Sequence, residues 1–462
     1  MTKPRINLKG TEKIDIENRE INDDDKSKKC EKSILDINQK NENVKTQVIP
    51  AKKVIQIIET YGTVNILAIE GSQIPLYSIT PIQGGIGLGK ISQLLEDDML
   101  EEIMHVPGKT IKVVHRKHGM CDTTLTLTPE DANNIVKKVA DGVNKKIDFQ
   151  NPLLDARLPD GSRVNATVPP ASPDGTTFTI RKFLKDPMTI VDLINTGTIN
   201  SRLAALLWMW VEGLNYKPAN ILVAGGTASG KTTTLNVLAM FIPESKRMIT
   251  IEDTAELRLN HEHWIRLEAV PPTEKGKEVT MDMLLKNTLR MRPDRIIVGE
   301  VRGEEAKTMF TAMNTGHDGV LGTVHANTAM ETITRLTNAP MNVPPVMLTA
   351  LDIIIMQQKM SIGERSVRRI NEICEISGLE RDTPRLNPIF KWDPASNILR
   401  ETGVPSKLRE QISRAAGITI AQFDQIAKHR QQILESLVAS NIRDANSVCK
   451  VIKDYYLNYR IK

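Results

Sequence analysis

Aromatic residues and cysteines are both scarce in this chain of 462 residues. Phe, Tyr and Trp make up 4% of it, and no stretch interleaves aromatic with basic residues in the way that favours stacking on nucleic-acid bases. The cysteines are scattered, and no C-x-x-C pair is present to hold zinc or to act in redox exchange. They are Cys30, Cys121, Cys374 and Cys449. We predict that they are reduced and mostly structural.

Long apolar runs and a strong excess of one charge are also missing. The run from Leu203 to Val211 is too short to cross a bilayer. Met1 to Arg5 leads into charged sequence rather than into the apolar segment of a signal peptide. The net charge of +5 argues neither for nor against nucleic acid. We therefore expect a cytoplasmic protein that reaches any membrane through partners.

Composition divides the chain into four segments. Residues 1–45 mix charges of both signs with few apolar residues, so burial cannot offset the entropy cost of ordering them. We expect a disordered tail there, and a solvated extension is favoured over a specific binding arm. An α+β domain is expected over 46–186, and alternating strands and helices over 187–375 fit a parallel sheet covered on both faces. Beyond about Pro340 helical signals dominate, so we expect 376–462 to be mainly helical.

Periodicity and turn residues predict the individual elements. Strands are expected at 61–69, 109–115, 176–183, 248–251, 295–298 and 320–323. Helices are expected at 129–144, 201–214, 281–289 and 304–311, and a hairpin turn at 159–161. Thr419 and Gln422 have the form of a capping box. It precedes an apolar stripe, expected to face the core, formed by Phe423, Ile426, Ile433, Leu434 and Leu437.

The segment from Ile221 to Thr234 has the pattern of a Walker A phosphate-binding loop. An apolar run suited to a buried strand breaks into a glycine-rich turn and then into a helical pattern. Backbone N–H groups of such a turn, with the helix N-terminus, attract a polyphosphate. Lys231 is expected to reach the β- and γ-phosphates, and the Thr232 hydroxyl to bind Mg²⁺. The nucleotide-binding candidates are Gly225, Gly226, Thr227, Ala228, Ser229, Gly230, Lys231, Thr232 and Thr233.

A P-loop ATPase also needs a carboxylate near the phosphates. The apolar strand at 295–298 ends in Gly299 and Glu300. The usual Walker B aspartate is absent, since Gly299 stands where it is expected. Glu300 is therefore our candidate to orient or deprotonate the attacking water.

A second pair of carboxylates, Glu252 and Asp253, ends the strand at 248–251. If this strand lies beside the P-loop strand, its carboxyl end opens onto the same crevice. Glu252 would then polarise water or help to hold Mg²⁺ through a water, whereas Asp253 also fits the start of a turn. His317 and His325 flank the strand at 320–323, so that at least one of them could approach a γ-phosphate as donor and sensor.

The order of these motifs resembles the ATPases of type II and type IV secretion systems. It runs from the Walker A loop through Ile-Glu-Asp and Arg-Pro-Asp…Val-Gly-Glu-Val-Arg-Gly to Thr-Gly-His…Thr-Val-His-Ala-Asn. The resemblance is dense over about 150–360 and includes the segment 155–165. The absence of a C-x-x-C zinc insert, together with 261–265 and 338–344, makes the chain most similar to the archaellum motor ATPase and its archaeal pilus relatives.

This resemblance implies a hexameric ring in which an N-terminal domain and a RecA-like domain clamp ATP with Mg²⁺. It implies that Glu252 is the catalytic carboxylate of the Asp box, Glu300 the Walker B glutamate and His325 the His-box sensor. Basic residues that the family draws toward nucleotide, or across subunits, match Arg157, Arg163, Arg181, Arg258 and Arg266, and we predict that Arg258 or Arg266 acts across the subunit interface. Ordinary surface salt bridges are an alternative role for these arginines.

The function expected from the resemblance is an ATP-driven motor. It would push on a polytopic membrane platform protein, with accessory cytoplasmic regulators, to assemble an archaeal filament such as the archaellum. An archaeal pilus or type II-like secretion ATPase is the alternative within the fold. A nucleic-acid translocase is a further alternative, disfavoured by the few aromatic residues, and no nucleic-acid partner is expected. A regulatory GTPase is disfavoured because no Asn-Lys-x-Asp motif follows the P-loop.

Overall fold

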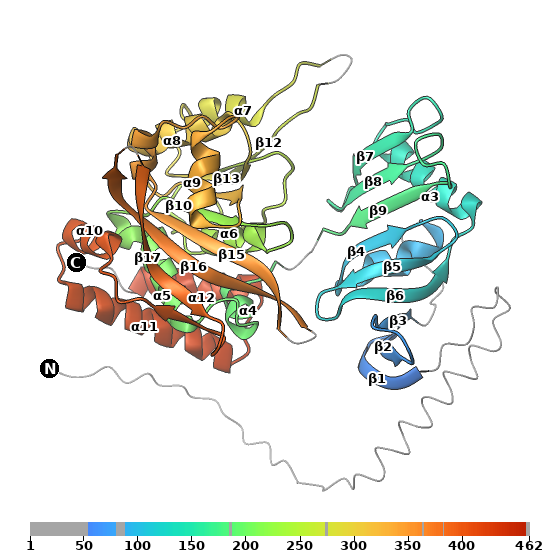
Figure 1. The fold of residues 1–462 in the computed structure, drawn as a ribbon, viewed down its shortest axis with the longest axis horizontal. Coiled ribbons are helices and arrows are strands. Elements are labelled where there is room, and N and C mark those ends of the chain that lie inside the picture. The colour runs from blue at the N-terminus through green and yellow to red at the C-terminus, as the bar shows by residue number, and fades with distance from the viewer. Residues whose placement is uncertain are drawn as a thin grey trace, which may run out of the picture. The chain divides into compact units, whose positions relative to one another are not determined.

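The structure, a computed structural model, describes residues 54–79, 88–183, 187–272, 276–362, 365–381 and 383–458. The chain divides into two compact units, residues 1–182 and residues 183–462 (Figure 1). Each unit has its own nine-stranded sheet. The tail expected over 1–45, and Cys30 within it, lie outside the described residues. Cys121, Cys374 and Cys449 are free thiols.

The N-terminal unit combines its sheet with short helices. In spatial order the strands are β1 (Val54–Tyr61), β2 (Val64–Ile69), β3 (Leu76–Ile79), β6 (Gly119–Thr126), β5 (Thr110–His115), β4 (Leu100–His105), β9 (Thr177–Arg181), β8 (Arg163–Thr167) and β7 (Leu153–Arg157). The helices are η1 (Gly89–Ile91), α2 (Ser92–Glu96) and α3 (Pro129–Gly142). Helix α3 begins after Thr128, whose hydroxyl and backbone N–H are both bonded to Asp131 in a capping box.

Most elements predicted for this unit are confirmed. Strands β5 and β9, helix α3 and the turn between β7 and β8 lie where they were expected. The strand expected at 61–69 is confirmed from Val64 onward as β2, but its start is wrong, because Gly62 takes a positive φ of 52° and turns the chain back, so that β1 pairs antiparallel with β2. Only glycine adopts such a conformation without strain.

The second unit is built on a mixed sheet. In spatial order its strands are β12 (Trp264–Glu268), β11 (Met248–Glu252), β13 (Arg295–Val301), β14 (Leu321–His325), β10 (Ile221–Gly225), β15 (Ile353–Ile362), β16 (Arg365–Glu380), β17 (Thr383–Asp393) and β18 (Ile398–Glu401). Its helices are α4 (Ile190–Asn195), α5 (Ser201–Glu212), η2 (Gly213–Asn215), α6 (Lys231–Ala239), α7 (Met281–Thr288), α8 (Glu305–Asn314), α9 (Ala329–Thr337), η3 (Pro345–Ala350), α10 (Lys407–Ala415), α11 (Ile420–Ala439) and α12 (Ala445–Asn458).

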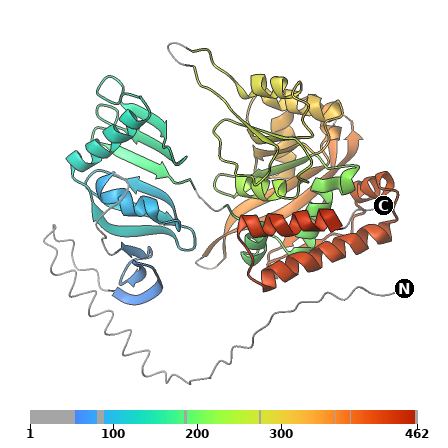
Figure 2. The same ribbon diagram turned by 180° about the vertical axis from the view of Figure 1, so that it is seen from behind.

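Two separate apolar cores cover the two faces of this sheet. Along β10, Ile221 and Val223 belong to the core with α5, α6, α11 and α12, whereas Leu222 and Ala224 belong to the core with α7, α8 and α9 (Figures 1 and 2). Alternate residues of a strand point to opposite faces, so a strand covered on both sides is apolar throughout. The fold class predicted from the sequence is confirmed: an α/β unit with a P-loop, preceded by an α+β unit and followed by helices.

The prediction that helices dominate beyond Pro340 is wrong for residues 353–401. The described residues of this range include β15, which pairs parallel with β10, and β16 to β18, which extend the sheet by antiparallel pairing. Strand β15 pairs with β10, which lies far earlier in the chain. Local periodicity does not indicate such long-range pairing. The helices begin only at α10. Helix α11 has the predicted capping box at Thr419, and its predicted stripe packs into the core.

Candidate functional site

The candidate site lies at the carboxyl ends of the parallel strands β10 to β15. In an open parallel sheet these ends share one edge, where ligands bind. The condition placed on β11, that it lie beside the P-loop strand β10, is not met, because β13 and β14 lie between them. Glu252 at the end of β11 instead neighbours β13.

The P-loop leaves β10 in a conformation that its glycines permit. A Cβ at Gly225 would lie 2.2 Å from the carbonyl oxygen of Gln357 on β15, so only glycine fits there. Gly230 has a φ of 93°, and Ala228 takes a positive φ of 58°. Helix α6 starts at Lys231, with Thr232 and Thr233 in its first turn. Backbone N–H groups of a helix N-terminus are thereby presented at the loop.

Lys231 folds across the loop. Its Nζ donates a hydrogen bond to the carbonyl oxygen of Gly226 at 3.1 Å. Burial lowers the pKa of this ammonium, and the carboxylate of Glu300 acts in the opposite direction. The structure therefore brings Glu300 within electrostatic reach of the P-loop lysine, as a shared phosphate site requires.

Only one of the two candidate histidines lies beside the P-loop. His325 ends β14 directly opposite Gly225 of β10, and its Nε2 lies 3.2 Å from the hydroxyl of Thr227. His317 precedes β14, at the amino end of the strand, and its Nδ1 is buried without a hydrogen-bond partner. Because opposite ends of a strand face opposite edges of the sheet, His325 is the candidate sensor.

The side chain of Glu252 is 2% exposed. Its Oε1 accepts hydrogen bonds from the backbone N–H groups of Glu256 and Leu257, both at 2.8 Å. Its buried Oε2 lies 3.8 Å from Nε of Arg266 and has no hydrogen-bond partner. Burial raises the pKa of this carboxyl, and the two N–H groups and Arg266 oppose that rise. One oxygen holds the loop after β11, and the other faces Arg266.

Gly299 makes room for Glu252. A Cβ at position 299 would lie 2.9 Å from Cγ of Glu252 and 3.4 Å from its Cβ. The carbonyl oxygen of Gly299 accepts a hydrogen bond from the hydroxyl of Thr323 at 2.6 Å, which holds the backbone in place. A Walker B aspartate at this position would displace Glu252. The absence noted in the sequence is thus explained by a carboxylate that arrives from the neighbouring strand.

Arg302 is a residue of the site to which the sequence analysis gave no role. Its Nη2 lies 2.7 Å from Oε2 of Glu300, and its Nη1 lies 3.9 Å from Oδ2 of Asp253. It therefore joins the carboxylates that end β13 and β11. The available signal was its position two residues after Glu300, inside the motif itself.

Arg368 of β16 is a second such residue. Its Nε donates a hydrogen bond to the carbonyl oxygen of Ala228 at 3.2 Å, and its Cδ lies 3.2 Å from the position of a Cβ on Gly230. The antiparallel strands that were predicted to be helical thus reach the P-loop. No local signal in the sequence points to this contact.

The two arginines proposed to act across subunits differ in their surroundings. Arg266 lies on β12 near Glu252, and its guanidinium carbon is 5.5 Å from the ring centroid of Trp264. The guanidinium carbon of Arg258 lies 3.0 Å from the ring centroid of Phe183, and its backbone N–H donates to Asn236 of α6. Of the two, Arg266 is the one brought next to a candidate catalytic carboxylate.

The other three candidate arginines form a row in the N-terminal unit. Arg157 of β7 is paired with Arg163 of β8, which is paired in turn with Arg181 of β9. Residues directly opposite each other in antiparallel strands point to the same face. Glu102 of β4 continues the row opposite Arg181. The sequence suggested these arginines one by one, and the register places them side by side.

The residues proposed to hold Mg²⁺ suit a hard cation with oxygen ligands. Thr232 offers a hydroxyl at the start of α6, and Glu252 offers a buried carboxylate oxygen without a hydrogen-bond partner. In the described part of the chain, no cluster of three His, Cys, Asp or Glu side chains is arranged to hold a metal by itself. Thr232 follows β10 and Glu252 ends β11, and β13 and β14 lie between these two strands.

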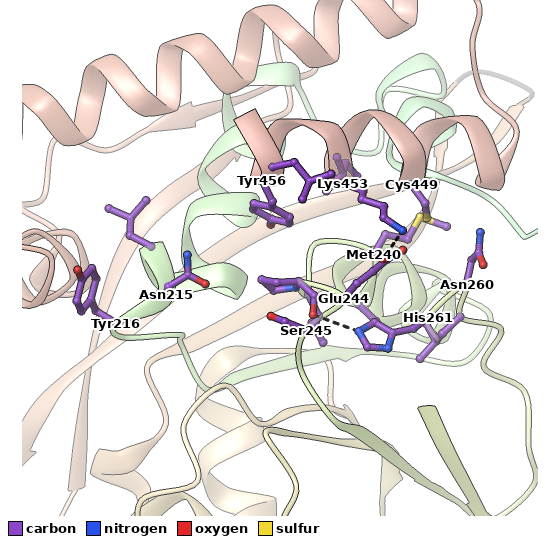
Figure 3. A pocket seen from close by; sticks show the side chains of 17 residues that line it. Asn215, Tyr216, Met240, Glu244, Ser245, Asn260, His261, Cys449, Lys453 and Tyr456 are labelled. Atoms are coloured by element: carbon purple, nitrogen blue, oxygen red, sulfur yellow. Dashed lines mark hydrogen bonds and ion pairs between the residues drawn. The ribbon is translucent and has the colours of Figure 1, made fainter. Parts of the chain in front are cut away.

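A cavity of about 600 Å³ lies at the other end of α6 (Figure 3). Lys453 of α12 points toward Glu244 there, with Nζ 2.5 Å from Oε2, and Nε2 of His261 lies 3.2 Å from the carbonyl oxygen of Pro243. The nine residues of α6 span about 13 Å between the two regions. None of the predicted site residues lines this cavity, so it is separate from the P-loop.

Within the described ranges, none of the helices has the length and apolar character needed to cross a membrane. Comparison with known proteins matches residues 89–450 to the family described as Type II/IV secretion system protein. An uncharacterized protein of Methanocaldococcus jannaschii is 33% identical and aligns with 81% of this chain and 75% of its own length.

Two further relatives come from bacteria. The conjugal transfer protein TrbB of Rhizobium radiobacter is 30% identical, over 65% of this chain and 90% of its own. Among solved structures, the VirB11 ATPase from the Brucella suis type IV secretion system is 26% identical, with a TM-score of 0.32, over 61% of this chain and 90% of its own.

Proposed function

The chain belongs to the type II/IV secretion system protein family, and on this premise we propose that it is an ATPase that couples ATP hydrolysis to the work of a membrane-bound machine. Its proposed working form is a hexameric ring, held at the cytoplasmic face of the membrane by partner proteins. The 30% identical conjugal transfer protein supports a role in transfer by such a machine.

The observation that carries this proposal is the meeting of three groups at the P-loop. Lys231 reaches across the loop, Glu300 lies within electrostatic reach of that lysine, and His325 lies 3.2 Å from Thr227. They come from three different strand ends of one sheet edge. A phosphate-binding cation, a candidate base and a hydrogen-bonding sensor are the parts that phosphoryl transfer to water requires.

The chemistry assigned to these residues is hydrolysis of the terminal phosphate. The oxygen of a water bonds to the γ-phosphorus while the bond from that phosphorus to the β,γ-bridging oxygen breaks, and ADP leaves with the bridging oxygen. Glu300 accepts the proton of the water. Lys231 and the loop N–H groups offset the negative charge on the phosphates. His325 responds to the γ-phosphate through its contact with Thr227.

Mg²⁺ bound with ATP would be held by the Thr232 hydroxyl and, directly or through a water, by the free oxygen of Glu252. When bound, the ion offsets phosphate charge. The residue fit supports this assignment, because Oε2 of Glu252 is buried with no hydrogen-bond partner. The two hydrogen bonds to Oε1 fix the carboxylate so that this oxygen stays in place.

The remaining arginines are proposed to complete the site. The row Arg157, Arg163 and Arg181 is proposed to contribute nucleotide-binding charge, and the strand register, which sets the three residues side by side, supports this proposal. Arg266 or Arg258 is proposed to act across a subunit interface. Charge supplied in this way is worth about 10³- to 10⁵-fold in other P-loop enzymes.

The machine that we propose is an archaeal type IV pilus-like filament such as the archaellum, worked through a polytopic platform protein and accessory cytoplasmic regulators. The resemblance of the sequence motifs to the archaellum motor ATPase supports this system. A pilus or type II-like protein secretion ATPase is the alternative within the same family. A nucleic-acid translocase has less support, because few aromatic side chains offer stacking surfaces.

The test of the enzymatic proposal is phosphate release by the purified wild-type chain and by Lys231→Ala. Hydrolysis should be lost in the variant with little change in thermal unfolding, because a point charge is removed rather than core packing. Lys307→Ala, which removes an exposed lysine of α8, is the control and should keep wild-type turnover. Turnover retained in folded Lys231→Ala would contradict the assignment.

The choice between systems needs a separate experiment. Deletion of the gene should remove surface filaments, seen by electron microscopy, if the chain drives filament assembly. Loss of secreted proteins with filaments intact would favour the secretion alternative. Strong stimulation of the ATPase by single-stranded DNA or RNA would instead favour the translocase.

A further inference from the structure

The ion pair between Glu300 and Arg302 engages the very carboxylate that the proposed function assigns to water. We propose that Arg302 is a switch on Glu300: it holds the carboxylate when no triphosphate is bound and moves to the γ-phosphate when ATP arrives. Glu300 is then released to accept a proton. This inference rests on the proposed ATPase function and adds a positioning residue to it.

The backbone of Arg302 is held in place, whereas its guanidinium group is exposed. Its backbone N–H and that of Gly303 donate to Oε1 of Glu305 at 2.6 and 2.8 Å, and Glu305 is buried. The side chain of Arg302 is 67% exposed, against 27% for Glu300. An exposed guanidinium moves at little cost, while the anchored backbone keeps it beside the site.

Two carboxylates lie near the guanidinium group of Arg302. Nη2 of Arg302 contacts Glu300 at 2.7 Å, and Nη1 is 3.9 Å from Asp253. The hydrogen bond that Arg302 donates to Glu300, ahead of the effect of Asp253, raises the pKa of the guanidinium, which stays charged in either position. Arg302 is therefore already shared between two anions and is not locked to one partner.

Electrostatics connect the same arginine to the phosphate position. Burial lowers the pKa of Lys231, Glu300 opposes this effect, and Arg302 adds to it. Arg302 thus acts on the ammonium that is proposed to bind the β- and γ-phosphates. A γ-phosphate placed there offers more negative charge than one carboxylate, and it presents oxygens in the fork geometry that guanidinium prefers.

The consequence is a site that distinguishes ATP from ADP. ADP has no γ-phosphate, so Arg302 stays on Glu300 and the carboxylate remains engaged. With ATP, the guanidinium leaves, the water bonds to the γ-phosphorus, its proton passes to Glu300, and the bond to the bridging oxygen breaks. Release of phosphate returns Arg302 to the carboxylate.

The test measures the affinity of ADP and of the non-hydrolysable β,γ-imido analogue of ATP by calorimetry. Glu300→Gln should bind the analogue about 2- to 5-fold more tightly than wild type, because Arg302 no longer has an ion pair to break. Its ADP affinity should stay within about 2-fold of the wild-type value. Arg302→Ala should weaken the binding of the analogue, leave the affinity for ADP unchanged and lower kcat. Arg302→Lys should recover part of the lost analogue affinity and of the lost kcat.

The double variant Glu300→Gln with Arg302→Ala decides between the outcomes. If Arg302 is the switch, the double variant does not show the tighter binding of the analogue seen in Glu300→Gln, and its affinity for the analogue equals that of Arg302→Ala alone. If the gain persists in the double variant, or if Arg302→Ala keeps the wild-type ratio of analogue to ADP affinity, the inference is overturned. A merely structural arginine would not make the effect of Glu300→Gln depend on its presence.

Arg400→Ala is the matched control, since Arg400 is 61% exposed and pairs with Asp393 on another part of the sheet. It should leave both affinities unchanged. Failure of the wild-type chain to bind either nucleotide would overturn the proposed function and this inference together. Normal ADP binding with no dependence on Arg302 would overturn the inference alone.

Discussion

The contact between Gly299 and Glu252 gives a sharp test of whether the position of Glu252 matters for catalysis. Gly299→Ala adds a single Cβ, which would lie 2.9 Å from Cγ of Glu252. Ordinary contacts begin near 3.4 Å, so the carboxylate or the strand must shift by at least about 0.5 Å. Since Thr323 holds the carbonyl of Gly299, we expect Glu252 to be the group that moves.

Two effects of different kind follow from that displacement. Overpacking should destabilise the second unit by about 1–3 kcal/mol, which lowers the midpoint of thermal unfolding by about 2–5 °C for a unit of this size. A catalytic group displaced by up to about 1 Å lowers turnover by as much as about 100-fold. Because the strain falls on a carboxylate of the site, we expect kcat to fall by about 10- to 100-fold.

Gly322→Ala is the matched control. It adds the same Cβ on the neighbouring strand β14, at 3.1 Å from Cδ2 of Leu222, in the apolar core and without contact to Glu252. Its loss of stability should be similar or smaller, with near wild-type turnover. Both variants are measured by thermal unfolding and by phosphate release at saturating ATP. Equal kcat values for the two folded variants would refute the argument that Glu252 must keep its position.

Mixing Lys231→Ala subunits with Arg266→Ala subunits, or with Arg258→Ala subunits, should restore phosphate release if the arginine acts across an interface, since some interfaces then hold both intact groups. Absence of phosphate release in both mixtures, although the subunits co-assemble, would contradict a site shared between subunits. Glu252→Gln should raise the unfolding midpoint of the nucleotide-free chain at pH 7 and lose this advantage as the pH falls through the raised pKa of Glu252 toward 4.5. The sign follows because burial raises the pKa of Glu252, so its ionisation at higher pH favours the unfolded state; an equal midpoint at pH 7 would contradict it. Arg368→Ala should weaken ADP binding by about 5-fold, in line with about 1 kcal/mol for one hydrogen bond, and unchanged affinity by calorimetry would show that its contact with Ala228 is dispensable.

The P-loop and its flanking elements could be predicted from the sequence because their causes are local. A buried strand, a glycine-rich turn and a helix follow one another within 221–239, and each is specified by its own residues. The same holds for α3, whose start is fixed by Thr128 and Asp131, and for α11 with its capping box. Short-range steric and hydrogen-bonding rules decide such features without reference to the rest of the chain.

The partners of these elements were decided only by the tertiary structure. That two strands separate β11 from β10, that Glu252 fills the space of the missing Walker B side chain at Gly299, and that Arg302 bonds to Glu300 all depend on the tertiary fold. The row of arginines in the N-terminal unit depends on register. Strand order and register are set by long-range packing of whole faces, and the same local patterns are compatible with several arrangements of neighbours.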